Sequence, residues 1–309
     1  MSVTSAAVSH GTARRFRYLA VVVCLIGVLA WYLDVFEWLR LGATVPQPEQ
    51  GAVSNGTYAN KYFDLSYPLP KGWTEGLAGP GPSQSAYYVL DTFVPAGEIT
   101  GTVLVAAQDS FFAAKDFSDA KDMAREFSRA MGAIEGMNVD RQPSEVTIAG
   151  RLFSRFDFSG VGLYRSTWVT GIRCHFVSFN LTANSPERLA EMVSSLNSVA
   201  YAGDRNAGRV DPVCIKNYAT PENLVAKVDP PAVGPTFTPI PVRMIISPDG
   251  NVKHVHVIRA TDEQRSSVEN ALGRWKFKPS QMQGRAAEVE TGVLLEFRPS
   301  GVVVYKGGA

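Results

Sequence analysis

The chain has 309 residues, with 30 lysine and arginine residues against 29 aspartate and glutamate residues. This near neutrality excludes the basic stripe that nucleic-acid binding requires, so no nucleic-acid partner is expected. The roughly 265 residues that follow the first hydrophobic run are enough for two domains of ordinary size.

The first element is the uncharged run Tyr18–Leu33. As a helix it would span about 24 Å, slightly less than a bilayer core of about 30 Å. Arg17 on one side and the aromatic residues around Trp31 and Trp38 on the other can reach the two interfaces. The pattern predicts a single-pass transmembrane signal anchor over residues 18–38.

The charges around this run predict its direction. Arg14, Arg15 and Arg17 precede it, whereas Asp34 and Glu37 follow it, so residues 1–17 are expected in the cytoplasm and the bulk of the chain on the exported side. A cleaved signal peptide is the alternative. Leu41-Gly42-Ala43 is a poor match to the small-x-small cleavage site that this alternative needs.

Residues 39–60 are polar and rich in Pro, Gly, Gln and Ser, which indicates a tether. A domain over 61–202 follows, with short runs of aromatic and β-branched residues that predict an antiparallel sheet. The predicted strands are 62–67, 87–93, 102–107, 146–150, 151–158, 162–169 and 173–182.

Two helices are predicted in this domain. Apolar residues recur at intervals of three and four between Phe117 and Met131, which is typical of a helix that buries one face. Ser185-Pro186 supplies a capping residue and a proline at the first helical position for the second helix, whose apolar positions are Leu189, Met192, Val193 and Leu196. The domain is therefore expected to be α+β.

A linker is predicted over 203–216, and a second domain over 217–300. Thr220-Pro221-Glu222 is expected to open a short helix that Asp229-Pro230-Pro231 ends. Strands at 239–246 and 252–259 form a hairpin through the Ser-Pro-Asp-Gly turn between them.

The rest of this second domain follows the same local signals. Thr261 and Gln264 form a capping box that starts a helix. A strand at 288–297 then completes a ββαβ unit, and residues 301–309 are expected to be a tail.

The cysteines and histidines are the candidate residues for a disulfide, a metal site or a reactive thiolate. Cys174 and Cys214 lie on the exported side, where they form either one disulfide or two buried thiols. His254 and His256 alternate on one strand without a third ligand motif, and His175 beside Cys174 fits strand packing better than thiolate activation. No nucleophile, metal or phosphate motif occurs, so no catalytic residue, metal or cofactor is expected, and the protein is not expected to be an enzyme.

The segment from Cys214 to Pro299 resembles the C-terminal domain of TonB-family energy transducers. The resemblance rests on the Pro-Asp-Gly-Asn-Val turn at 248–252, on Val255 and Val257, and on Ala271 leading to Trp275-Lys276-Phe277-Lys278-Pro279. Gly284, Val289 and Phe297 complete the match.

This resemblance implies a periplasmic domain in a protein of the inner (cytoplasmic) membrane. It further implies that an envelope protein or extended peptide binds by adding a strand to a sheet edge, in transport energy coupling. The edge that corresponds here is formed by Val293, Leu294, Leu295, Glu296 and Phe297.

Two departures from the family favour an alternative, a periplasmic scaffold or ligand-binding protein that is not energised. A folded domain replaces the long Pro-rich spacer of TonB. The predicted anchor also lacks the intramembrane histidine that couples TonB to a proton-driven motor.

The first domain resembles PsbP- and Mog1-like folds at its start. The resemblance rests on Tyr62-Phe63-Asp64-Leu65-Ser66-Tyr67-Pro68 followed by Lys71-Gly72-Trp73. It implies a curved antiparallel sheet and does not imply a function.

Overall fold

A computed structural model describes residues 47–201, 212–231, 233–234, 238–282, 284–298 and 301–306. They all belong to one compact unit of the chain, Pro46–Ala309. The predicted cytoplasmic segment 1–17, the anchor 18–38 and most of the linker 203–216 lie outside the described residues. Among the helices that the structure describes, none combines the length and hydropathy that crossing a membrane requires.

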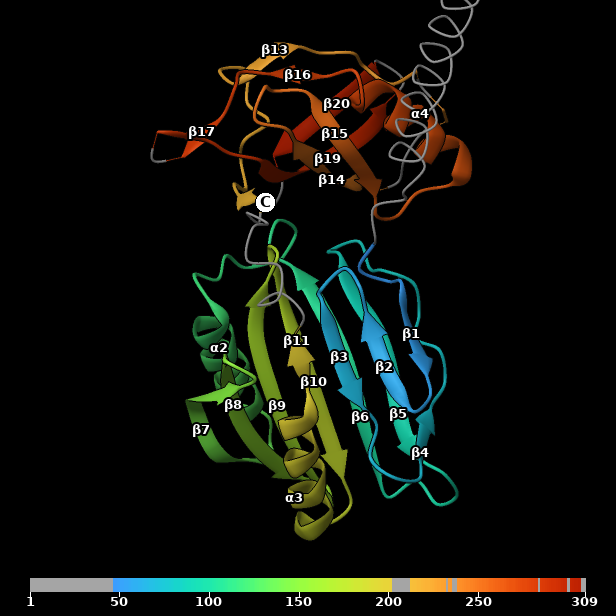
Figure 1. Cartoon of the computed structure of the whole chain (residues 1–309), viewed down its shortest axis with the longest axis vertical. Coiled ribbons are helices and arrows are strands. Elements are labelled where there is room, and N and C mark those ends of the chain that lie inside the picture. Colours follow the sequence, from blue (N-terminus) through green and yellow to red (C-terminus); the bar gives the residue numbers. More distant parts are fainter. Residues whose placement is uncertain are drawn as a thin grey trace, which may run out of the picture. The chain divides into compact units, whose positions relative to one another are not determined.

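The described chain is a mostly antiparallel α+β fold, and its largest sheet has seven strands (Figure 1). The strands pair in the order β4-β5-β6-β10-β9-β8-β7. Their bounds are β4 Trp73–Glu75, β5 Tyr87–Pro95, β6 Gly101–Asp109, β7 Met137–Ile148, β8 Arg151–Gly160, β9 Leu163–Ile172 and β10 His175–Ala183.

A smaller sheet in the order β1-β2-β3-β11 faces the large one (Figure 1). Its strands are β1 Gly51–Ser54, β2 Thr57–Asn60, β3 Leu65–Pro68 and β11 Ala200–Tyr201. Tyr58 and Tyr67 of this sheet pack with Phe93 and Phe179 of the large sheet in one buried core. Both sheets therefore share a single hydrophobic interior.

The first hairpin corrects the extent of the predicted tether, because β1 and β2 lie inside the segment 39–60. Asn55 and Gly56 both have positive φ, at 51° and 70°. An Asn-Gly pair with two positive φ angles forms the tight turn that suits a two-residue hairpin. The folded region thus begins before the predicted boundary at residue 61.

Two capped helices flank the large sheet. In α2, Ala120–Gly132, the Asp119 side chain accepts a hydrogen bond from the backbone N–H of Asp122. In α3, Pro186–Ser195, Ser185 accepts from the N–H of Arg188 and Pro186 begins the helix, as predicted. Helix α2 packs on β7, β8 and β9, whereas α3 packs on β6, β9 and β10.

The C-terminal part contains a separate sheet in the order β12-β19-β14-β15, with β20 also paired to β19. Its strands are β12 Val213–Cys214, β14 Ile240–Ile246, β15 Val252–Val257, β19 Val289–Arg298 and β20 Gly301–Lys306. Helix α4, Asp262–Leu272, packs on β15 and begins with the predicted capping box of Thr261 and Gln264. The core beneath α4 includes Val268, Leu272 and the almost fully buried Trp275.

Glycine is required in the turn between β14 and β15. Gly250 has φ of 87°, and a Cβ atom there would lie 2.0 Å from the carbonyl oxygen of Phe277. The same contact brings the backbone N–H of Phe277 within 2.8 Å of the Gly250 carbonyl oxygen, to which it donates. Only a residue without a side chain permits this approach.

Two further short pairs complete the structure, and one of them corrects a prediction. β13, Leu224–Ala226, pairs with β16, Lys276–Phe277, and β17, Gln281–Met282, pairs with β18, Arg285–Ala286. The helix expected after Thr220-Pro221-Glu222 is instead a turn that leads into β13. So short a segment has too few hydrogen bonds to offset the cost of helix nucleation, whereas pairing with β16 satisfies its backbone.

The predicted edge strand is the second correction in this part of the chain. Val293–Leu295 pair with β14 on one side, and all of Val293–Phe297 pair with β20 on the other. The segment 301–309 was expected to be a tail, but Gly301, with φ of 124°, begins β20, which returns along β19. The sheet edge on this side therefore lies at β20, and residues 293–297 are interior.

Candidate functional site

A disulfide joins the first part of the chain to the C-terminal part. Cys174 and Cys214 are bonded, with their Cα atoms 5.6 Å apart. Cys174 lies in the two-residue turn between β9 and β10, where both it and Arg173 have positive φ. Neither residue is a glycine, so this turn holds a conformation that costs roughly 1–2 kcal/mol per residue.

A buried ionic cluster lies beside this disulfide, and we call Asp109, His175, Arg243 and Glu290 the junction cluster. Arg243 places one guanidinium nitrogen 2.6 Å from Asp109 Oδ2 and another 2.7 Å from Glu290 Oε1. All four residues are at most 2% exposed. Asp109 ends β6 of the large sheet, so this ion pair links two sheets that are far apart in sequence.

His175 is held neutral within the junction cluster. Burial lowers its pKa well below the ordinary value, and the positive charge of Arg243 lowers it further. Nδ1–H donates to the carbonyl oxygen of Arg173 at 2.8 Å, while Nε2 accepts from Arg243 at 2.7 Å. Burial also disfavours the charged form of Asp109 and so raises its pKa, although the charge of Arg243 opposes this effect. The polar groups of the cluster form ion pairs and hydrogen bonds with one another, which indicates a structural role.

The two alternating histidines, His254 and His256, do not form a metal site. The His256 side chain is buried with Nε2 3.2 Å from Glu49 Oε1, and burial followed by the charge of His256 lowers the pKa of His254. Within the described ranges, no group of three His, Cys, Asp or Glu side chains has the geometry of a metal site.

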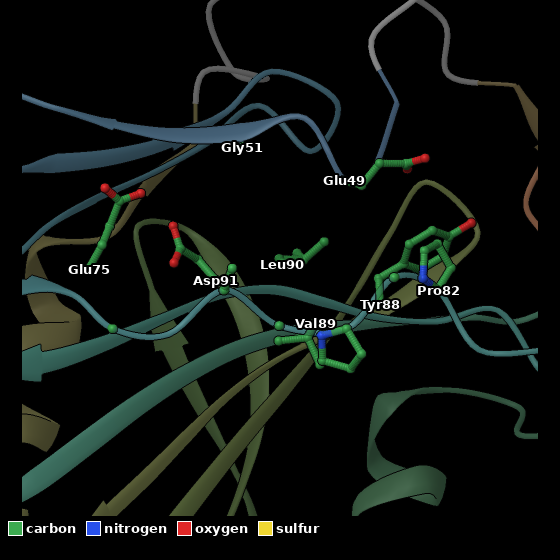
Figure 2. Close-up of a pocket in the computed structure, with 13 residues that line it drawn as sticks. Glu49, Gly51, Glu75, Pro82, Tyr88, Val89, Leu90 and Asp91 are labelled. Carbon is green, nitrogen blue, oxygen red and sulfur yellow. The ribbon is translucent and has the colours of Figure 1, made fainter.

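An acidic cavity of about 490 Å³ opens between the loop that follows β4 and the strand β5 (Figure 2). We call it the acidic cavity. It is lined by Glu49, Gly51, Glu75, Gly76, Ala78, Gly79, Pro80, Gly81, Pro82, Tyr88, Val89, Leu90 and Asp91. Three of these residues are acidic and none is basic, so the charged groups of the lining are all negative.

The chain positions these carboxylates through local structure. Asp91 lies at a bulge of β5, where the register with β6 shifts between Val89 and Asp91. Its Oδ1 accepts the backbone N–H of Thr92 at 2.7 Å. Glu75 ends β4, which pairs with β5 beside Asp91. A bulge is a common means of redirecting a side chain in a sheet, and here it orients a carboxylate into the cavity.

The surroundings of the acidic cavity disfavour the charged form of Asp91 but favour that of Glu49. Burial, together with the negative charge of Glu75, raises the pKa of Asp91 to about 6 against the opposing hydrogen bond from the Thr92 backbone N–H. Burial also acts to raise the pKa of Glu49, but the hydrogen bond and charge of His256 outweigh it, so that pKa is lowered. Among the described residues that line the cavity, none is basic and able to offset the charges of Asp91 and Glu75.

Tyr88 adds an unsatisfied polar group to the same wall. It is 1% exposed, and its hydroxyl oxygen has no hydrogen-bond partner among the described residues. Burial raises its pKa well above 10, and the charge of Asp109 acts in the same direction. A buried hydroxyl without a partner costs free energy, and such groups concentrate where a ligand or water completes the site.

Sequence reasoning did not identify the acidic cavity. The available signals were the run Gly76 to Pro82, with three glycines and two prolines in seven residues, and an aspartate inside the otherwise apolar and aromatic strand β5. Neither signal indicates that Glu49, more than 40 positions before Asp91, lines the same cavity. That proximity arises from packing.

Removing the charge of Asp91 is expected to stabilise the protein. The folded-state pKa is raised, so the ionised carboxylate opposes folding above about pH 6, and this cost disappears as the pH falls from about 6 to 4. Solvent screens part of the effect because Asp91 is half-exposed. We expect Asp91→Asn to raise the Tm at pH 8 on the order of 2 °C and to leave it unchanged at pH 4, by differential scanning calorimetry. If the variant's Tm at pH 8 were equal to or below that of the wild type, the ionised Asp91 carboxylate would not oppose folding.

Comparison with known proteins identifies distant structural likenesses only. The chain is 15% identical to cyanobacterial PsbP from Synechocystis sp. PCC 6803, with a TM-score of 0.36 over 49% of this chain and 96% of that one. A point mutant of the protein Mog1 shows 12% identity and a TM-score of 0.29 over 47% and 85%. A crystal structure from Bacteroides thetaiotaomicron VPI-5482 shows 16% identity and 0.29 over 50% and 49%.

These likenesses concern the PsbP and Mog1 folds that the segment Tyr62 to Trp73 resembles. With TM-scores of 0.36 and below, they carry no argument about function. No family model and no curated protein matches the chain.

Proposed function

We propose that the protein is a membrane-anchored periplasmic binding protein whose C-terminal part takes up an extended segment of an envelope partner. The binding element is the outer edge of β20, to which the partner adds a strand. The observation that carries the proposal is the apolar run Val302–Val304 on a strand that, among the described strands, pairs only with β19. The TonB-like residue pattern from Cys214 to Pro299 supports the same mode of binding.

The composition of β20 favours strand addition. Val302, Val303 and Val304 follow one another, and β20 pairs only with β19 among the described strands. Val302 and Val304 pack towards the core under α4, so this strand is held in place. Proteins ordinarily protect a free apolar edge with charged residues, proline or a bulge, and these three positions contain none of them.

The opposite edge of the sheet, β15, is less available. Asn251 just before it bridges to Lys276, and α4 packs on the strand. His256 near its end contacts Glu49. An incoming strand would have to displace these contacts, whereas the outer side of β20 pairs with no strand among the described residues.

The test is site-specific photo-crosslinking of the full chain in its membrane. A photoreactive amino acid at Val303 is expected to capture a partner, because the partner strand would lie within about 5 Å. The matched control carries the same group at the exposed Lys253 on β15, where no capture is expected. Mass spectrometry of the adduct should identify an extended segment of an envelope protein. Capture at neither position, or equally at both, contradicts the proposal.

Energy coupling is a separate question within this proposal. The run Tyr18–Leu33 contains no acidic, basic or histidine side chain that could take part in proton-linked work. This feature favours binding without energy input. Co-purification of the full chain with a proton-driven motor would instead support energy coupling.

A further inference from the structure

Helix α2 leaves a gap where it packs on the large sheet. The buried apolar side chains beneath the helix form two separate clusters, one around Val169 and Phe176 and the other around Phe156 and Phe158. A cavity of about 230 Å³ is lined by members of both clusters, and we call it the aromatic cavity. Side chains ordinarily fill such space in a protein interior, whereas this cavity is open to solvent beside Phe127, which is 40% exposed. Its lining consists of Tyr87, Gln108, Met123, Phe127, Met131, Phe156, Phe158, Thr167, Val169, Phe176, Ser178 and Asn180.

The alternation of side chains along the strands brings this lining to one face of the sheet. Phe176, Ser178 and Asn180 are alternate residues of β10. Tyr87 of β5 lies opposite Gln108 of β6, and Gln108 in turn lies opposite Phe176. Helix α2 packs on β7, β8 and β9 (Figure 1), so the cavity extends from the helix across β10 towards β6 and β5.

The lining is aromatic and carries no charge. Among the described residues that form it, none has an acidic or basic side chain, and burial raises the pKa of Tyr87, which keeps that phenol neutral. The four phenylalanines offer ring surfaces for stacked and edge-to-face contacts, and the two methionines of α2 add polarisable sulfur. Because a buried charge without a partner is costly, this lining favours an uncharged aromatic ligand over an ionised one.

A strip of polar side chains crosses the apolar lining. Thr167 Oγ1 donates to Asn180 Oδ1 at 3.2 Å, and Asn180 Nδ2 donates to Ser178 Oγ at 2.9 Å. Ser178 is 9% exposed, and its own hydroxyl proton has no acceptor within the described ranges. Gln108 donates through Nε2 to two backbone carbonyl oxygens, and its Oε1 has no donor in the part of the chain that the structure describes. The cavity therefore presents one unused donor and one unused acceptor.

These two groups lie close enough to hold a single hydroxyl group. Ser178 pairs with Ala106 of β6, so Gln108 is its diagonal neighbour on the same face of the sheet. Diagonal neighbours in a sheet lie about 7–8 Å apart, within reach of a group that bridges them. A phenolic hydroxyl both donates and accepts, so it can donate to Gln108 Oε1 while it accepts from Ser178.

We propose that the aromatic cavity binds an uncharged phenol of one or two fused rings. The rings pack against the phenylalanines of β8 and β10 and against α2, and the hydroxyl bridges Ser178 and Gln108. The size agrees, because a cavity of about 150 Å³ holds benzene and this one, at about 230 Å³, has space for a second ring. An aromatic acid of the same size is disfavoured, because its carboxylate meets no cation in the described lining.

The test uses 2-naphthol as the probe and the methionine methyl groups of the detergent-solubilised full chain as reporters. With carbon-13 labelled methyl groups, ring currents of bound 2-naphthol should shift the NMR resonances of Met123 and Met131, which line the cavity. Met192 and Met244 are buried outside it and should not shift. The matched anion 2-naphthoate should require a concentration at least about tenfold higher. One detergent concentration in all samples keeps the free concentration of each probe comparable.

Variants of Ser178 connect the binding to this cavity. Ser178→Leu fills the space and should abolish the shifts of Met123 and Met131. Thr182→Leu is the matched control, because Thr182 lies on the same face of β10 outside the lining, and it should bind like the wild type. Ser178→Ala keeps the space but removes the donor, so affinity should fall about threefold or more.

The alanine variant also guards against a folding defect in Ser178→Leu. Unshifted Met123 and Met131 resonances in the wild type, equal shifts of Met192 and Met244, or equal affinities for 2-naphthol and 2-naphthoate would each overturn the proposal. Wild-type affinity in both Ser178 variants would overturn it as well. None of these outcomes bears on strand addition at β20, which the crosslinking experiment tests separately.

Discussion

Replacing Arg243 by methionine is expected to lower the free energy of unfolding by about 3–5 kcal/mol. The substitution leaves Asp109 and Glu290 buried without the guanidinium that lies 2.6 Å and 2.7 Å from their oxygens. Burying an unpaired charge costs far more than the pair itself contributes. Urea unfolding followed by circular dichroism at pH 8 measures the loss.

Two comparisons make this prediction specific. Removing all three charges together, with Arg243→Met, Asp109→Asn and Glu290→Gln, should recover much of the lost stability, because no unpaired charge stays buried. The single variant should also be less destabilised at pH 5 than at pH 8, since burial raises the pKa of Asp109 and its neutral form tolerates the missing cation. A triple variant as unstable as the single one, with no dependence on pH, would show that lost packing dominates instead.

Opening the disulfide is expected to cost about 4 kcal/mol. Cys174 and Cys214 are separated by 40 positions, and the chain-entropy relation gives roughly this value for a loop of that length. The urea midpoint of the wild type should therefore fall when a reductant is added. The measurement is the same unfolding experiment with and without reductant.

The control for the disulfide is the Cys174→Ser, Cys214→Ser double variant. It should be as unstable as the reduced wild type and should not respond to reductant, even though Cys24 is still present. An unchanged urea midpoint in the reduced wild type would contradict this prediction. In that case the disulfide would contribute nothing to stability.

The acidic cavity and the C-terminal sheet share one residue. Glu49 lines the cavity and contacts His256 of β15 at 3.2 Å.

The sequence by itself determined the features that local chemistry controls. The capping box of Thr261 and Gln264, the Ser185-Pro186 helix start and the Ser-Pro-Asp-Gly turn all appear where their residue patterns indicate. Each depends on contacts within four residues, so the pattern alone contains the information. The alternation of aromatic and β-branched residues likewise predicted β5, β6, β8, β9 and β10 of the large sheet, but it missed β4 and most of β7.

Only the tertiary structure decided which strand forms the edge and which charges meet. The segment 301–306 reads as a tail until its pairing with β19 is known, and that pairing covers Val293–Phe297. Arg243 and Asp109 are 134 positions apart, so no local pattern indicates that they form a buried pair. The same holds for Glu49 and Asp91 in the acidic cavity. Contacts between distant segments depend on how whole sheets pack, and the sequence near each residue carries no signal of its distant partner.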